Sequence, residues 1–264
     1  MNIVPIHAAN PGPMTGEGNW TWLLPGTEAT LIDAGTGAPR HLAALDDALR
    51  GAPLAQVLVT HAHTDHASGA PAIATRHQET RFRKMLWRER DAKWPVPYEP
   101  IADGDRIAAG DTSLVAIHTP GHAPDHLCFW HEDSRTLFCG DLAVKGGTVW
   151  IPASLQGDLA AYLASLERVI ALAPARLMPA HGPVIEEPET VLRGYIDHRL
   201  EREQQILDAL RHGDQTPDEI VARVYRGLKP QLLPMAQEGV IAHLVKLEAE
   251  SRVRQDADRW LIVG

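Results

Sequence analysis

The stretch that decides the fold is T-H-A-H-T-D-H at residues 60–66, which offers four metal-binding side chains: His61, His63, Asp65 and His66. It directly follows Q-V-L-V-T at residues 56–60, an apolar, β-branched run that predicts a buried strand. Zinc binds imidazole nitrogen and carboxylate oxygen, and a catalytic zinc keeps one position open for water. Four such groups cannot all reach one metal from so short a loop and leave that position open. The stretch therefore predicts two adjacent metals, each completed by ligands from elsewhere in the chain.

Three further candidate ligands end other predicted strands. T-P-G-H ends on His122, L-F-C-G-D ends on Asp141, and L-M-P-A-H ends on His181. Because a sheet places successive strand ends along one edge, these side chains are expected to meet the first four. Asp33 also ends a strand, and it is expected either beneath the metal site or in an ordinary turn. A histidine-rich surface loop is the alternative explanation, but loops have no physical reason to crowd imidazoles directly after an apolar strand.

Composition limits the class of protein. A chain of 264 residues with 44% hydrophobic content can hold one large domain, or one domain and a small appendage. Its two cysteines, Cys128 and Cys139, exclude a disulfide framework. The net charge of -9 counts against a general polyanion-binding surface. No export signal, mitochondrial presequence or apolar run of about 20 residues is evident. We therefore expect a cytoplasmic protein without membrane contact.

Residues 76–93 differ in character from the rest of the chain. Seven Lys or Arg meet three Asp or Glu here, a net of +4, and Phe82 and Trp87 lie among them. A solvated helix face is the expected explanation, with a lid or a polyanion contact as alternatives. Elsewhere, short apolar runs predict strands at 20–24, 29–33, 107–119 and 127–130, and helical periodicity predicts helices at 41–49 and 159–172.

In this order, T-H-A-H-T-D-H, T-P-G-H, G-D and A-H-G strongly resemble the motifs of the metallo-β-lactamase fold superfamily of hydrolases. The resemblance implies an α/β (α+β) fold, a four-layer αβ/βα sandwich with two sheets face to face. It implies two Zn²⁺ per chain, with Fe or Mn as alternatives. One metal is assigned to His61, His63 and His122, the other to Asp65, His66 and His181, with Asp141 bridging. Asp65 is also the expected catalytic residue, because it can orient the nucleophile. His126 is expected to support the site or relay protons, or to be a loop histidine.

A narrower resemblance covers nearly the whole chain. N-P-G-P-M-T at 10–15, G-H-A-P-D-H at 121–126, H-G-P-V-I at 181–185 and Y-I-D-H-R at 195–199 are similar to the β-lactamase-like protein 2 subgroup. Its animal members are endoribonucleases, so single-stranded RNA is the first expected substrate. One departure is Trp20 and Trp22, where the subgroup has G-T-N-T-Y-L. A thioesterase or hydroxyacylglutathione-hydrolase-like activity on a small ester or thioester is the second expectation, and β-lactamase the third. A non-enzymatic winged-helix regulator is the rival from another class.

The C-terminal part predicts a winged helix. We expect a catalytic domain at 1–190, then a linker helix and winged-helix-like domain at 191–264. Thr216-Pro217-Asp218-Glu219 is a capped helix start, 232–249 a further helix, and 252–263 a hairpin. Residues 191–264 carry 11 Lys or Arg against 12 Asp or Glu, a net of -1. Because nucleic-acid docking needs phosphate-neutralising cations, we favour packing, dimerisation into a homo-oligomer, or walling of the active site.

Overall fold

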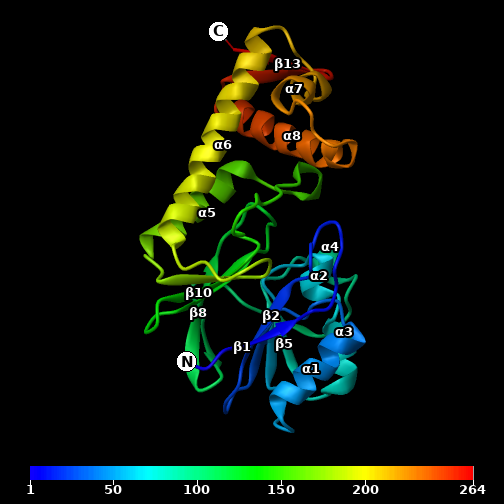
Figure 1. Ribbon diagram of the computed structural model, residues 1–264, viewed down its shortest axis with the longest axis vertical. Helices are drawn as coiled ribbons and strands as arrows, with labels where there is room; N and C mark the ends of the chain where they lie inside the picture. Colours follow the sequence, from blue (N-terminus) through cyan, green and yellow to red (C-terminus); the bar gives the residue numbers. More distant parts are fainter. Residues whose placement is uncertain (264) are drawn as a thin grey trace.

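Two β-sheets packed face to face form the centre of the protein, which we describe from a computed structural model covering residues 1–263 (Figure 1). The first sheet has six strands in sequence order: β1 Val4–His7, β2 Trp20–Leu24, β3 Thr30–Ile32, β4 Gln56–Leu58, β5 Arg81–Lys84 and β6 Tyr98–Pro100. Strands β1 to β3 pair antiparallel, and β3 to β6 run parallel.

The second sheet has five strands in the order β11-β10-β9-β8-β7. Strands β10 and β11 pair in parallel, and the other neighbours pair antiparallel. The strands are β7 Arg106–Ala109, β8 Thr112–His118, β9 Leu127–His131, β10 Thr136–Gly140 and β11 Arg176–Pro179. The end of β10 is therefore followed by Asp141, and the end of β11 lies beside it.

Three apolar cores separate four layers. Between the sheets, Leu58 of the first sheet packs in one cluster with Phe129 and Phe138 of the second. A second core joins the first sheet to helices α1 Pro39–Leu49 and α3 Ala70–Arg76. A third joins the second sheet to helices α5 Leu159–Ala171 and α6 Pro188–Arg211. The order helix, sheet, sheet, helix confirms the predicted αβ/βα sandwich.

The predicted metal loop begins at the carboxyl end of a buried parallel strand. All residues of β4 are buried, as expected of a strand covered on both faces. The short helix α2, Thr64–Ala67, starts directly after His63. The T-H-A-H-T-D-H stretch thus turns from the strand end into the first turn of a helix, which brings its side chains to one edge of the sheet.

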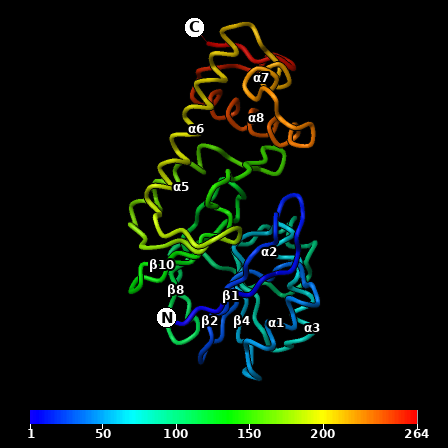
Figure 2. The backbone as a smooth tube through the Cα atoms, viewed as in Figure 1, coloured from blue at the N-terminus to red at the C-terminus, as the bar shows by residue number. Residues whose placement is uncertain are grey.

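The chain ends in a winged helix, as predicted. It contains α7 Pro217–Val224, the 3-10 turn η2 Pro230–Leu232, α8 Leu233–Ala249 and the hairpin of β12 Val253–Asp256 and β13 Arg259–Ile262. Thr216 and Glu219 form the expected capping box at the start of α7. Figure 2 follows α6 as one continuous run from the sandwich to this part of the chain. Helix α6 contributes Tyr195 to the sandwich core and Ile206 to the winged-helix core, so it belongs to both parts. The predicted domain boundary at residue 190 therefore stays a proposal.

The basic segment is not a solvated helix face, and this prediction was wrong. Helix α3 ends at Arg76, strand β5 occupies Arg81–Lys84, and a short helix α4 spans Arg88–Asp91. In β5 the side chains alternate, so that Phe82 and Lys84 are buried. The physical reason is the two-residue period of a strand, which the high charge of the segment masked. Among the described residues, no helix is both long enough and apolar enough to cross a membrane.

Candidate metal centre

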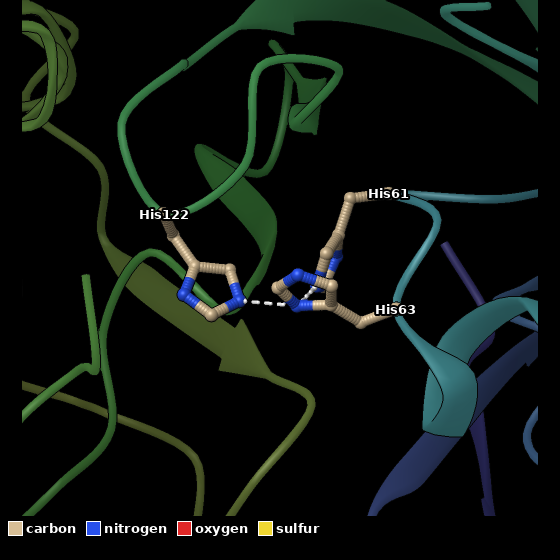
Figure 3. A group of neighbouring side chains, drawn as sticks. All are labelled: His61, His63 and His122. Carbon is tan, nitrogen blue, oxygen red and sulfur yellow. Dashed lines mark hydrogen bonds between the residues drawn. The ribbon is translucent and has the colours of Figure 1, made fainter. Parts of the chain in front are cut away.

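Three histidine rings converge at the first predicted metal position (Figure 3). The Nε2 atom of His61 lies 3.0 Å from Nδ1 of His63, and the Nε2 atom of His122 lies 2.8 Å from the same atom. His61 and His63 come from the loop after β4, whereas His122 comes from the loop between β8 and β9. The tertiary structure therefore brings together two segments that are 59 residues apart, as the sequence predicts.

The other four predicted ligands form a second group beside the first. The Oδ2 atom of Asp65 lies 3.4 Å from Nε2 of His66 and 3.2 Å from Nε2 of His181. The Oδ1 atom of Asp141 lies 3.3 Å from the Nε2 atoms of both histidines. Its Oδ2 atom lies 3.5 Å from Nε2 of His122 in the first group. Asp141 thus contacts both groups, which is the position that a bridging ligand needs.

Hydrogen bonds fix the orientation of the ligand rings from behind. The Nδ1 atom of His66 lies 2.7 Å from Oδ2 of Asp33, and Nδ1 of His61 lies 3.0 Å from Oγ1 of Thr60. The carbonyl of Trp150 accepts a hydrogen bond of 2.6 Å from Nδ1 of His122. Such partners set the tautomer and aim the other nitrogen at a metal. Asp33 therefore lies beneath the site, which was the first of its two expected positions, and not in an ordinary turn.

The chemistry of the donors fits divalent metals. Nε2 of His66 and Oδ1 of Asp141 are both buried, and neither has a hydrogen-bond partner within residues 1–263. Buried polar atoms without partners are costly, and a cation between them would satisfy both. Imidazole nitrogen and carboxylate oxygen, without a thiolate, suit zinc and also iron or manganese.

Burial and neighbouring charges shift the pKa values of the histidines in the two groups in opposite directions. Burial lowers the pKa of His63 to about 3, and the adjacent His122 adds to this shift. Burial also lowers the pKa of His122 itself. It acts in the same direction on His66, but the carboxylates of Asp65 and Asp141 outweigh it and raise the pKa of His66 well above its ordinary value. The first group consequently offers neutral imidazoles, which is the form of histidine that binds a metal.

His126 lies directly behind the predicted ligand Asp141 and supports it. Its ring is fully buried, its Nε2 atom accepts the backbone N–H of Asp141 at 3.1 Å, and its Nδ1 atom lies 2.8 Å from Oγ1 of Thr119. Both nitrogens are therefore engaged in holding the loop that carries Asp141. Gly140 has a φ of 48°, and a Cβ there would lie 2.8 Å from the His126 ring, so the backbone and ring pack too closely for a side chain.

Three supporting residues were missed by the sequence reasoning. The Oδ2 atom of Asp125 accepts hydrogen bonds from the backbone N–H of Ala62 at 2.9 Å and from Nζ of Lys84 at 2.8 Å. Asn19 donates from Nδ2 to the carbonyl of Asp65 at 2.9 Å. Asp125 lies in the G-H-A-P-D-H motif, which was the only sign in the sequence that this residue matters. The motif does not indicate that Ala62 and Lys84 are its partners.

The sequence matches the family described as the metallo-beta-lactamase superfamily over residues 14–181, which is more than half of the chain. The chain belongs to this superfamily of hydrolases. Residues 216–260 match a second family, the beta-lactamase associated winged helix domain. The two matches fall on the sandwich and on the C-terminal part, and they confirm the predicted family.

Relatives of this metallo-β-lactamase superfamily chain carry different names. The beta-lactamase-like protein 2 homolog of Drosophila melanogaster is 34% identical, over 96% of this chain and 90% of the relative. The atrochrysone carboxyl ACP thioesterase of Aspergillus chevalieri is 30% identical, over 99% and 87%. A metallo-beta-lactamase family protein of Thermus thermophilus has the same fold, with a TM-score of 0.82 at 19% identity over 99% and 98% of the two chains.

A cavity of about 980 Å³ opens above the predicted metal ligands of this superfamily member. His63, Asp65, His122, Asp141 and His181 line its metal side. Most of the remaining wall is apolar, with contributions from Met14, Trp20, Val149, Trp150, Leu155 and Met235. Met235 belongs to α8, so the winged helix contributes to the cavity wall. This agrees with the predicted role of walling the active site.

Helix α6 holds the loop that forms one wall of the cavity. The hydroxyl of Tyr195 donates to the carbonyl of Val144 at 3.0 Å and accepts the N–H of the same residue at 3.2 Å. One turn later, the buried Arg199 donates to the carbonyl of Val149 and, at 3.2 Å, to Oγ1 of Thr148. The next residue is Trp150, whose carbonyl orients His122. The Y-I-D-H-R motif thus connects the linker helix to the predicted metal ligand His122.

Replacing Arg199 with methionine should lower kcat and metal affinity by about tenfold, the lower end of the usual effect of losing a group that supports a ligand. The reason is that the Thr148–Trp150 segment, and with it the carbonyl bound to His122, would lose its anchor. Metal titration and steady-state kinetics measure the effect. Arg193→Met is the control, because Arg193 is exposed on the same helix and pairs with Glu189. Equal effects of the two changes would contradict the anchoring role.

Proposed function

We propose that this protein is a thioester hydrolase that uses two divalent metal ions, zinc in the first place, with iron or manganese as alternatives. The observation that carries the proposal is the cavity above the metal-binding residues. Its wall is mainly apolar, and Arg90 is the one Lys or Arg among the described residues that line it. Such a surface suits an acyl chain, whereas a polyanion needs several cations along its path.

The positions of the cavity residues indicate what each would do in thioester hydrolysis. Two metals bound at such a site supply Lewis acidity and lower the pKa of a water molecule toward ~7. Asp65 lines the cavity, and its backbone carbonyl is held by Asn19, so its carboxylate can orient the attacking water toward the thioester carbonyl. The apolar wall around Trp20 and Trp150 would fix the acyl chain and exclude bulk water. The name of the Aspergillus chevalieri relative, a thioesterase, agrees with this assignment.

Single-stranded RNA is the second candidate, because Trp20 and Trp150 in the cavity wall could stack on bases. The cations of residues 76–93 give it little support. Arg76 pairs with Asp46, Arg81 with Glu28 at 3.0 Å, and Arg83 with Glu99 at 3.5 Å, while Lys84 is buried. These ion pairs neutralise the charge that a phosphate backbone would use, so we place the thioester first.

Neither cysteine is expected to act as a nucleophile. Cys128 and Cys139 are buried, and burial raises the pKa of Cys128 to about 12 and that of Cys139 well above its ordinary value. Because only the thiolate is reactive, iodoacetamide should leave both thiols and the turnover of the native protein unchanged. Mass spectrometry and a hydrolysis assay check this. Alkylation of either thiol with a parallel loss of activity would contradict the metal-based mechanism.

The experiment is a turnover screen of the metal-loaded protein. The panel holds acyl thioesters on N-acetylcysteamine and on coenzyme A, one β-lactam, and a single-stranded RNA. The Asp141→Ala variant, purified in the same way, serves as the control for contaminating esterases and ribonucleases. We expect thioester hydrolysis by the wild type that the variant lacks, with no RNA cleavage above the control. RNA cleavage that requires Asp141, without thioester turnover, would reverse the order of the two candidates.

A further inference from the structure

Arg90 differs from the other cations of its segment. It is half-buried, it lines the cavity, and its Nε atom is buried without a hydrogen-bond partner among residues 1–263. Its neighbours in the sequence either pair with carboxylates, as Arg81 and Arg83 do, or point to solvent, as Arg88 does. Because no hydrogen bond or ion pair within residues 1–263 involves this guanidinium, its N–H groups remain for a ligand in the mainly apolar cavity.

The protein holds Arg90 in place from behind. The guanidinium lies over the ring of Trp87, 5.5 Å from its centre. The next residue, Asp91, accepts hydrogen bonds from Nζ of Lys84 and from the backbone N–H of Trp87, both at 2.7 Å. Lys84 also binds Asp125, which in turn accepts the backbone N–H of Ala62 in the metal loop. One buried network therefore fixes helix α4 relative to the predicted metal ligands.

We propose that Arg90 determines specificity by binding an anionic group of the thioester substrate. This inference rests on the proposed function and names the substrate class for the same site. The apolar wall would hold the neutral part of the molecule, while the guanidinium binds a carboxylate or phosphate in bidentate fashion. The anion can come from two sources, a carboxylate at the far end of the acyl chain or a phosphate of the leaving thiol. Both present the same chemistry to Arg90.

Four substrates separate these sources. Glutaryl and pentanoyl thioesters differ in one terminal carboxylate, and each is made on pantetheine and on 4′-phosphopantetheine, which differ in one phosphate. For the wild type we expect a kcat/KM at least tenfold higher for the charged member of one pair. In Arg90→Gln that ratio should fall by about tenfold or more, the usual effect of losing a hydrogen bond to a charged group. Raising the salt concentration should lower the wild-type ratio as well.

Arg88→Gln is the matched control, because Arg88 is on the same short helix but is exposed and does not line the cavity. A loss of charge preference in Arg90→Gln alone, mainly through KM, supports the proposal, and the affected pair identifies the source of the anion. Equal ratios in wild type and Arg90→Gln, or equal losses in both variants, would overturn it while leaving the thioesterase assignment intact.

Calorimetric binding provides a readout that does not depend on turnover. The metal-loaded protein is titrated with glutaramate against pentanamide, which differ in one terminal carboxylate, and with 4′-phosphopantetheine against pantetheine, which differ in one phosphate. Tighter binding of one charged member that disappears in Arg90→Gln would support the anion site even if no thioester is hydrolysed, and the proposed function would then fall by itself. Equal binding of charged and neutral members by the wild type would overturn the anion site.

Discussion

Asp141→Ala should abolish activity and the binding of both metals, whereas His63→Ala should abolish activity but retain close to one equivalent of metal. The difference follows from the geometry, because Asp141 lies within 3.5 Å of ligand atoms in both groups and His63 contacts the first group alone. We expect kcat/KM to fall by roughly a thousandfold or more in each variant, equivalent to about 4 kcal/mol of transition-state stabilisation.

Elemental analysis of the purified wild type should give close to two equivalents of metal per chain, and the same measurement identifies the metal. His212→Ala is the control, because His212 is exposed at the end of α6, away from the cavity. A wild-type protein that is active without metal would refute the metal mechanism. Retention of two equivalents by Asp141→Ala would refute its bridging position.

Lys84→Met should destabilise the folded protein by roughly 3–5 kcal/mol, the usual cost of removing one partner from a buried ion pair. The side chain of Lys84 is fully buried, and its Nζ atom lies 2.8 Å from Asp125 and 2.7 Å from Asp91. Without the ammonium, two carboxylates remain in a poorly hydrated environment. Burial already raises the pKa of Asp125, although Lys84 counteracts this shift. Urea unfolding measures the change in the free energy of unfolding.

The control for this prediction is Lys93→Met, a lysine of the same segment that is exposed and should change stability by less than about 0.5 kcal/mol. If Lys84→Met does not fold, Lys84→Met combined with Asp125→Asn should recover part of the loss. The asparagine can still accept the N–H of Ala62 but carries no charge. Equal stabilities of the two single variants would show that the buried network contributes nothing.

The sequence by itself determined which histidines and aspartates meet at the sheet edge, and the layers around them. His61, His122, Asp141 and His181 each follow an apolar run, and strand ends meet at a sheet edge whatever the connecting segments are. Local chemistry sufficed to single out this cluster, because imidazoles and carboxylates crowded after a buried strand have few uses other than the predicted metal binding. The capping box at Thr216 likewise marked the start of α7, since its hydrogen bonds lie within four residues.

Only the tertiary structure decided the roles of Lys84, Asp125 and Arg90. All three are charged, and a sequence assigns a charge to the surface unless a partner is known. The partner of Lys84 is 41 residues away, so its burial depends on how β5 and the loop before β9 pack. Arg90 belongs to the same basic segment but faces a cavity whose other walls come from distant loops and from α8. Whether a charge is buried, paired or offered to a ligand is set by these long-range contacts, which no local pattern encodes.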